Sequence, residues 1–426
     1  MLANISVPLL GLVDTAVIGH VAGVVELGAI AVGSLVFSFV YWGFGFLRMG
    51  TTGFVAQAVG ADDEHEVLAT SARGLLLAVF LACLILLFQW PIALLAFSSL
   101  QASDAVEALS ANYFSIRIWG APATLSLFVL MGVLIGLGKS RLLLLLQLFL
   151  NSINAVLDVY FAAFLELGVT GIALGTVLAE WLACGFGCWL VWRCLGRRVG
   201  ESDVLFDWHN IANQTKIRQL LSVNADIMIR TLALLFSFAW FINQSAQFGD
   251  VVLAANHVLL QLISFSAFFL DGYAFVVEAL VGKAIGAKSY QQYKKAIRYS
   301  SELAAVTAIL LALIILSIGE LIIMNLSGSE EVLEVSRPVL PIVALYIGCA
   351  FVAFQLDGIF IGASGTKAMR NASLLATLVF VGVASLAAQT AGNTGLWLAF
   401  VIYVIMRALA LAWFFPDLFR KTCAFN

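Results

Sequence analysis

Asp14 is the residue whose surroundings point most directly to a chemical role. It lies within an apolar stretch, residues 5–19, and the first 47 residues hold no Lys or Arg that could pair with it locally. Burying an ionised carboxylate in a bilayer costs roughly 2.5 to 3.5 kcal/mol even on lenient insertion scales. We therefore expect Asp14 to serve as an ion or proton site, the alternative being a carboxylate that only packs against a neighbouring helix.

A second group of polar residues is predicted at a similar depth. Asn154 precedes Asp158 by one helical turn on the same face, and Asn151 lies three residues further back. Counted from the helix ends, Asp14, Asp158 and Thr176 all lie ~9–12 Å below the outer surface. The two acids would not both ionise comfortably in a low dielectric, which favours proton coupling. Na⁺ at Asp14, Asn154, Asp158 and Thr176 stays open as an alternative, as does a purely structural polar plug.

Three further acids fall in the second half of the chain. Asp271 and Glu278 are seven residues apart and therefore share one helix face, and Asp357 lies on a later apolar segment. Asp271 and Asp357 are candidates for a cation or substrate site. Glu278 fits such a site and fits equally well an ion pair with Lys283 at the membrane interface.

Other polar patterns are interpreted as structural. Asp226 and Arg230 stand four residues apart on one predicted helix and are expected to neutralise each other. The stretch Gly136–Ser140 resembles a phosphate-binding loop but lacks the first glycine of that motif, because Val133 occupies its position. Neither a Ser/His/Asp nor an HExxH arrangement is present, and no metal-ligand cluster is predicted. We expect no enzymatic activity and no cofactor.

These residues must be positioned by membrane-spanning helices. The chain has 426 residues, is 62% hydrophobic and only 11% charged, and has a mean hydropathy of +1.03, far from the composition of a soluble protein. Twelve segments are long and apolar enough to cross a bilayer. They are residues 4–20, 27–49, 67–97, 109–137, 142–165, 168–193, 216–243, 251–282, 291–318, 338–363, 370–390 and 395–416.

The basic residues predict the orientation of these helices. Seventeen of the 22 Lys and Arg residues lie in or beside loops on one side of the predicted membrane, and only Arg337 lies in an opposite loop. By the positive-inside rule, both termini of this multi-pass protein should be cytoplasmic. The net charge of −3 gives no indication of a nucleic-acid partner.

The chain repeats itself once, at an offset of 226 residues. Gly60, Gly132 and Gly136 align without gaps on Gly286, Gly358 and Gly362. Since six helices separate equivalent positions, the sequence predicts an all-α fold of two six-helix lobes related by pseudo-twofold symmetry about the membrane normal. The predicted division is an N-lobe at 1–195, a cytoplasmic linker at 196–215 and a C-lobe at 216–426.

Several short segments, in this order and spacing, resemble the MATE (multidrug and toxic compound extrusion) family of transporters, in the branch of the DNA-damage-inducible protein F. They are Pro8–His20, Leu47–Gly53, Asn154 with Asp158, Asp226–Arg230, Leu270–Gly272 with Glu278, and Leu356–Ala363. The resemblance implies an antiporter that expels amphipathic, often cationic compounds by alternating access of its two lobes.

The resemblance also implies roles for individual residues. Asp14, Asn154, Asp158 and Thr176 match the coupling site of the N-lobe, where protonation is proposed to bend the first helix and release substrate outward. Family members usually carry a proline about four turns before the aspartate, and here Pro8 is the remaining candidate for the bend. The expected setting is a bacterial inner membrane, with the chain working as a monomer on drugs or toxic organic cations and contributing to antibiotic resistance.

Three other functions remain open at this point. The first is the same antiport driven by Na⁺. The second is flipping of a lipid-linked precursor, for which several cationic residues would be expected in the cleft. The third is a membrane receptor or scaffold without transport, which binding without flux would support.

Overall fold

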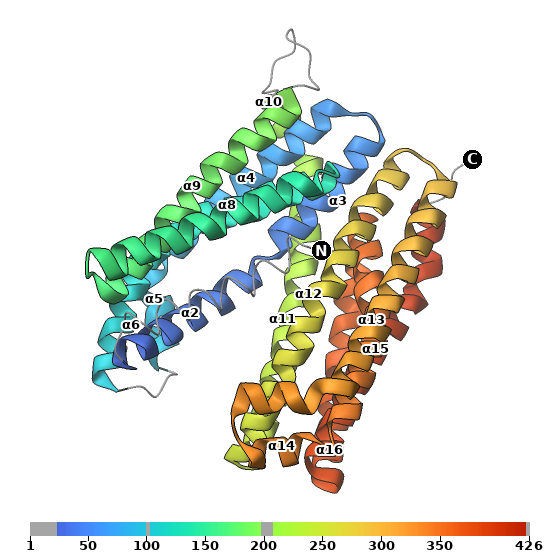
Figure 1. Cartoon of the computed structure of the whole chain (residues 1–426). Helices are drawn as coiled ribbons and strands as arrows, with labels where there is room; N and C mark the ends of the chain where they lie inside the picture. Colours follow the sequence, from blue (N-terminus) through green and yellow to red (C-terminus); the bar gives the residue numbers. More distant parts are fainter. Residues whose placement is uncertain (1–23, 99–102, 197–207, 423–426) are drawn as a thin grey trace. The chain divides into compact units, whose positions relative to one another are not determined.

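The computed structural model describes residues 24–98, 103–196 and 208–422, and these parts of the chain are helical without any β-strand. The predicted first helix at 4–20, with Pro8 and Asp14, lies outside the described residues. Figure 1 shows the arrangement of the helices. In chain order they are α2 (Val24–Gly43), α3 (Phe46–Gly60), α4 (Glu64–Leu87), α5 (Gln89–Ser98), α6 (Asp104–Arg117), the 3₁₀ turn η1 (Ile118–Gly120), α7 (Ala121–Gly136), α8 (Ser140–Asp158), the π-helical turn η2 (Val159–Phe164), α9 (Gly168–Gly196), α10 (Trp208–Ile211), α11 (Gln214–Ala246), α12 (Asp250–Gly286), α13 (Tyr290–Ser327), α14 (Glu330–Ser336), α15 (Leu340–Gly362) and α16 (Thr366–Thr422).

Ten stretches of the described residues are long and apolar enough to cross a membrane. They coincide with predicted segments, some of which are interrupted in the structure; the segment predicted at 67–97 is divided between Leu87 and Gln89 into α4 and α5. The segment predicted at 27–49 is interrupted between Gly43 and Phe46, where α2 ends and α3 begins. The segments predicted at 370–390 and 395–416 correspond to the two parts of α16, which are separated by a kink at Gly392, where the backbone is non-helical with a φ of 57°. Glycine suits this kink because it adopts positive φ at little steric cost.

Contacts along the chain separate it into two compact units, which meet in sequence between Leu220 and Leu221. We call them the N-unit and the C-unit. In the N-unit, α7 packs against α3, α4 and α9, α8 lies along α9, and α2 lies along α6. In the C-unit, α15 packs against α12, α13 and α16, and α14 lies across one end of α12 and α13 (Figure 1). The predicted boundaries at 195 and 216 stay a prediction.

The 226-residue repeat is visible in the backbone of both units. Helices begin 226 residues apart at Val24 and Asp250, and again at Glu64 and Tyr290. Backbone φ is positive at matching positions as well, in the pairs Asp62 and Lys288, Gly138 and Ser364, and Glu166 and Gly392. Equivalent turns therefore connect equivalent helices in the two units.

The repeated glycines serve one packing purpose in both units. A Cβ placed on Gly132 of α7 would lie 2.5 Å from the carbonyl oxygen of Arg48 on α3. A Cβ placed on Gly358 of α15 would lie 2.5 Å from the carbonyl oxygen of Ala274 on α12, and Arg48 and Ala274 are themselves 226 residues apart. Small residues let two membrane helices approach closely. The glycine matches predicted from sequence thus mark the same helix crossing twice.

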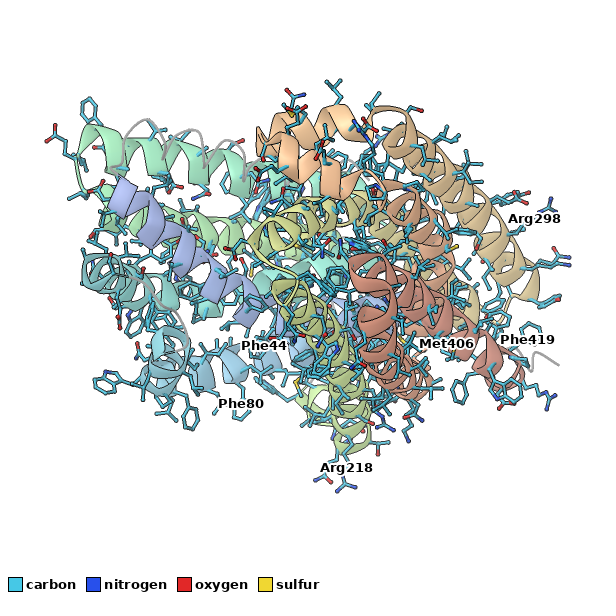
Figure 2. The ribbon with its side chains drawn as sticks, turned by 90° about the horizontal axis from the view of Figure 1, so that it is seen from below. Phe44, Phe80, Arg218, Arg298, Met406 and Phe419 are labelled. Atoms are coloured by element: carbon cyan, nitrogen blue, oxygen red, sulfur yellow. The ribbon has the colours of Figure 1, made fainter. Side chains whose placement is uncertain are left out.

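The outer surface of the described helices is rich in large apolar side chains, such as Phe80, which points away from the ribbon in Figure 2. The charged Arg218 and Arg298 also project outward near the helix ends (Figure 2). An apolar exterior with charges near the ends is the pattern expected of helices that face lipid.

Candidate ion-coupling site

The predicted polar group of the N-unit assembles where α8 packs on α9. Asn154 and Asp158 of α8 are each only 4% exposed. The side-chain amide of Asn154 donates to Asp158 Oδ2 at 3.0 Å and to Thr176 Oγ1 of α9 at 3.2 Å. The structure therefore brings together three of the five residues predicted for this site.

The hydrogen bonds show which atoms of this group donate and which accept. The Thr176 hydroxyl donates to the carbonyl oxygen of Ile172 at 2.9 Å, so its oxygen is the acceptor for Asn154. The NH₂ group of Asn154, and not its carbonyl oxygen, faces both Asp158 and Thr176. A Na⁺ ion held among these side chains would need an oxygen at this position, because hard cations take oxygen ligands.

The backbone around Asp158 is shaped to admit its carboxylate. A Cβ on Gly175 of α9 would collide with Asp158 Oδ1, so only glycine leaves room there. Directly after Asp158, α8 widens into the π-helical turn η2, Val159–Phe164. Such turns are rare and occur frequently at functional sites.

The other residues predicted for this site have different outcomes. Asn151 lies on α8 and is half-buried. Asp14 and the bend candidate Pro8 lie outside the described residues, so their roles stay predictions.

In the C-unit, Asp357 forms the centre of a buried charge cluster. Its Oδ2 atom accepts a close ion pair from Arg230 of α11 and a second, at 2.6 Å, from Arg407 of α16. All three residues are at most 8% exposed. A single carboxylate thus neutralises one of two guanidinium charges. This arrangement does not favour the predicted use of Asp357 as a ligand for a cation.

The expected pairing of Asp226 with Arg230 is wrong. Asp226 instead accepts a hydrogen bond from Arg370 at 2.7 Å and another from the Thr366 hydroxyl at 3.1 Å, both on α16. Residues four apart on a helix are neighbours by default, but here each side chain finds a better partner on a helix packed against α11.

Asp271 and Glu278 lie on α12 where α15 crosses it. Asp271 is half-buried, whereas Glu278 is only 1% exposed, with Gly362 of α15 packed on its backbone. The close glycine crossing covers this face of α12 and so buries Glu278. The alternative of an ion pair between Glu278 and Lys283 stays a prediction. The structure does not test whether Asp271 and Glu278 bind a cation or substrate.

The N-unit also holds a buried ion pair that sequence reasoning did not assign. Arg117 at the end of α6 donates to both carboxylate oxygens of Glu180 on α9 at 2.9 Å. The Arg117 guanidinium also lies over the ring of Phe37, 5.3 Å from its centre. Gly120 makes room for the pair, since a Cβ there would collide with Glu180. The sequence offered only a weak indication of this pair: Arg117 and Glu180 each lie well inside a predicted apolar segment, where a charged side chain needs a partner.

Within the described residues, no group of three or more His, Cys, Asp or Glu side chains is placed to hold a metal ion.

Elsewhere in the N-unit, Arg73 links the short helix α10 to α4. Its guanidinium donates to the carbonyl oxygens of Ile211 at 3.2 Å and Asn210 at 2.8 Å, and pairs with Glu66 at 2.9 Å.

The family model named MatE matches the chain twice, at residues 1–160 and 227–386. The two matches begin 226 residues apart, at the spacing of the internal repeat, and together they cover most of the sequence.

Two curated relatives resemble the chain over nearly its whole length. DNA damage-inducible protein F of Escherichia coli (strain K12) is 36% identical over 416 residues, which cover 96% of this chain and 88% of the relative. Multidrug and toxin extrusion protein 1 of Homo sapiens is 23% identical over 442 residues, which cover 99% of this chain and 74% of the relative.

Solved structures share the fold at low sequence identity. One is described as the outward-facing conformation of a multidrug resistance MATE family transporter of the MOP superfamily. It superimposes with a TM-score of 0.88 at 20% identity, covering 98% of this chain and 93% of that one.

Proposed function

Since this chain belongs to the MatE family, we propose that it exports amphipathic or cationic drugs in exchange for protons. The resemblance inferred from the motifs and the all-α membrane-transporter fold are both confirmed. The chain is a multidrug efflux transporter of this family, whose members are transporters and not enzymes. The coupling ion, the substrates and the site residues belong to the proposal.

One observation carries the choice of the proton. The Asn154 amide points its NH₂ group at both Asp158 and Thr176, at 3.0 and 3.2 Å. A proton needs only a carboxylate oxygen as its acceptor, whereas Na⁺ would need several converging oxygens. The donor at the centre of this group supports the proton over Na⁺, for which Asn154 would have to turn its amide around.

The contrast with the C-unit supports placing the coupling step in the N-unit. Asp357 is held by Arg230 and Arg407, so its charge is already engaged by two fixed cations. Removing that carboxylate charge by protonation would leave two buried guanidiniums without compensation, which is costly. Asp158 Oδ2 instead accepts a hydrogen bond from the neutral amide of Asn154, a partner that carries no charge of its own to be left uncompensated when Asp158 is protonated.

The proposed coupling step follows from the hydrogen bonds of Asp158. Hydrogen bonds to an ionised carboxylate are roughly twice as strong as those between neutral groups. A proton on Asp158 therefore weakens its bond from Asn154, and with it the link that Asn154 makes to Thr176 across α8 and α9. Asp14, which shares the proton in this proposal, would transmit the change to the first helix, with Pro8 as its bending point.

The remaining parts of the proposal concern setting and substrate. We place the chain in the bacterial inner membrane as a monomer with both termini cytoplasmic. The arginines Arg230 and Arg407 are held by Asp357 and are at most 8% exposed, so this structure does not present them to a lipid-linked pyrophosphate. Drug export is accordingly favoured over precursor flipping.

Efflux from proteoliposomes of known orientation tests the proposal. Ethidium export is measured under an imposed pH gradient and, separately, an imposed Na⁺ gradient, for wild type, Asp14→Asn and Asp158→Asn. Glu302→Gln, which alters an exposed ion pair on α13, is the matched control. We expect export driven by the pH gradient that both site variants lose and the control keeps. Export driven only by Na⁺, or coupled export retained in Asp158→Asn, contradicts the proposal.

A further inference from the structure

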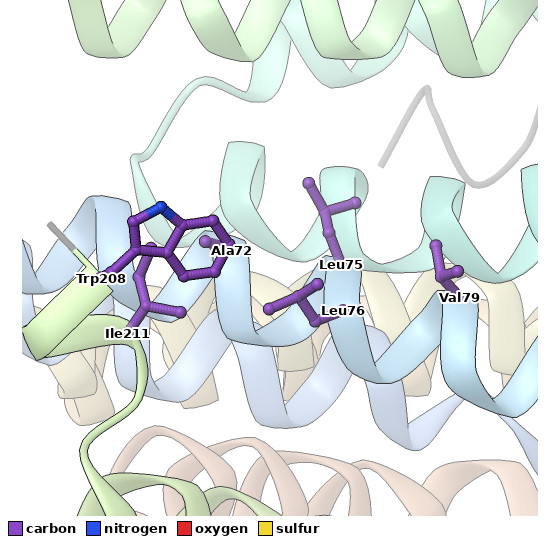
Figure 3. Close-up of a pocket in the computed structure, with 6 residues that line it drawn as sticks. All are labelled: Ala72, Leu75, Leu76, Val79, Trp208 and Ile211. Atoms are coloured by element: carbon purple, nitrogen blue, oxygen red, sulfur yellow. The ribbon is translucent and has the colours of Figure 1, made fainter. Parts of the chain in front are cut away.

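A fully apolar groove runs along α4 beside the short helix α10 in the N-unit. Its lining consists of Ala72, Leu75, Leu76, Val79, Trp208 and Ile211, and its volume is about 210 Å³. Figure 3 shows Trp208 and Ile211 at one end of the groove and Val79 at the other. Residues 72–79 extend about 10 Å along the helix axis, which is the length of a substantial part of a fatty-acyl chain.

The groove opens toward the surroundings of the protein. The side chains of Trp208, Leu76 and Val79 are 66%, 53% and 48% exposed. They belong to, or lie against, a helix that is apolar and long enough to span a membrane. In a membrane, the surroundings of such a groove are lipid, so an acyl chain is the group expected to contact it.

Two basic side chains, Arg73 and Lys216, lie toward the Trp208 end of the groove, beside the acidic first turn of α4. Arg73 donates to the carbonyl oxygen of Ile211, a lining residue, and forms an ion pair with Glu66. The Lys216 ammonium lies 3.6 Å from the same Glu66 carboxylate. Lys216 is the member of the cluster that faces outward, with 47% of its side chain exposed.

We propose that this groove is a binding site for an anionic phospholipid. One acyl chain lies along residues 72–79, and the phosphate binds the Lys216 ammonium next to Trp208. A tryptophan at the level of the headgroups and a basic residue beside it are the usual features of the membrane interface. The lipid would also brace α10, which Arg73 already fastens to α4.

Photo-crosslinking tests the proposal on the whole protein in mixed liposomes. The probes are a phosphatidylglycerol and a phosphatidylcholine that carry the same diazirine on one acyl chain, and labelled peptides are mapped by mass spectrometry. We expect the phosphatidylglycerol probe to label residues 72–79 and 208–211 about fivefold more than the phosphatidylcholine probe. This factor corresponds to about 1 kcal/mol for one basic residue near an anionic lipid.

Two variants separate a headgroup site from ordinary surrounding lipid. Lys216→Gln should bring phosphatidylglycerol labelling of the groove down to the level of phosphatidylcholine. Lys139→Gln, which removes an exposed charge from another loop, should leave the fivefold preference intact. Equal labelling by the two probes in wild type, or an unchanged preference in Lys216→Gln, overturns the proposal. Neither result depends on drug transport, so the test is independent of the proposed coupling.

Discussion

Replacing Gly175 with alanine should impair coupled export because α9 approaches α8 at that residue without room for a side chain. Besides its collision with the Asp158 carboxylate, the new Cβ would lie 3.0 Å from the Asp158 backbone nitrogen and 3.1 Å from the Leu157 carbonyl carbon. A rotamer change cannot relieve contacts with backbone atoms, so the two helices must separate. Overpacking of this kind costs about 1–3 kcal/mol.

The size of the separation predicts which hydrogen bond is lost. Restoring an ordinary contact of 3.4 Å from 3.0 Å moves the helices apart by about 0.4 Å. The same shift stretches the bond from Asn154 to Thr176 from 3.2 Å to about 3.6 Å, beyond hydrogen-bonding distance.

The assay is pH-gradient-driven ethidium efflux from proteoliposomes, with thermal unfolding in detergent as the measure of folding. Gly185→Ala is the matched control, since it makes the same change on the same helix at a position where a Cβ meets nothing within 4 Å. We expect slower coupled efflux from a folded Gly175→Ala protein and wild-type efflux from Gly185→Ala. Wild-type efflux in both would refute the role assigned to the α8–α9 contact.

Three other predictions follow from the described contacts. Thr176→Val keeps the volume of the side chain but removes the acceptor for Asn154, so coupled efflux should fall while Thr176→Ser retains it; equal efflux in the two variants contradicts this. Asp357→Asn should lower the free energy of unfolding by about 3–5 kcal/mol because it leaves two buried arginines uncompensated. Asp226→Asn should cost less, since its partner Arg370 is 33% exposed, and equal losses in denaturant unfolding would count against this reasoning. Gly132→Ala and Gly358→Ala should each destabilise the protein by about 1–3 kcal/mol, by similar amounts, because both introduce a Cβ 2.5 Å from a carbonyl oxygen at equivalent crossings; melting temperatures that differ widely would show that the crossings are not equivalent.

The contacts among Asn154, Asp158 and Thr176 were predictable because most of their geometry is local. Asn154 and Asp158 are one turn apart on a single helix, and Thr176 follows on the next helix after a short connection, at a depth that can be counted from the helix ends. The contact between Asn154 and Thr176 needed only that two consecutive helices pack side by side.

The buried charges of the C-unit were not predictable in the same way. Asp226 and Arg230 satisfied the i, i+4 rule, yet Arg230 pairs with α15 and Asp226 pairs with α16. Arg and Asp side chains reach several ångströms from the backbone, so a partner is chosen among all helices within that reach. The choice depends on how each helix is rotated about its axis, and no local pattern records that rotation.

The sequence by itself determined that this chain crosses the membrane many times, that it repeats after 226 residues, and to which family it belongs. These properties follow from hydropathy and from glycines, which act within one helix or at one crossing. Only the tertiary structure decided which acids are neutralised by arginine and which face neutral donors. Charge pairing in a low dielectric depends on separations of a few ångströms between helices that are more than a hundred residues apart in the chain, and packing alone sets those separations.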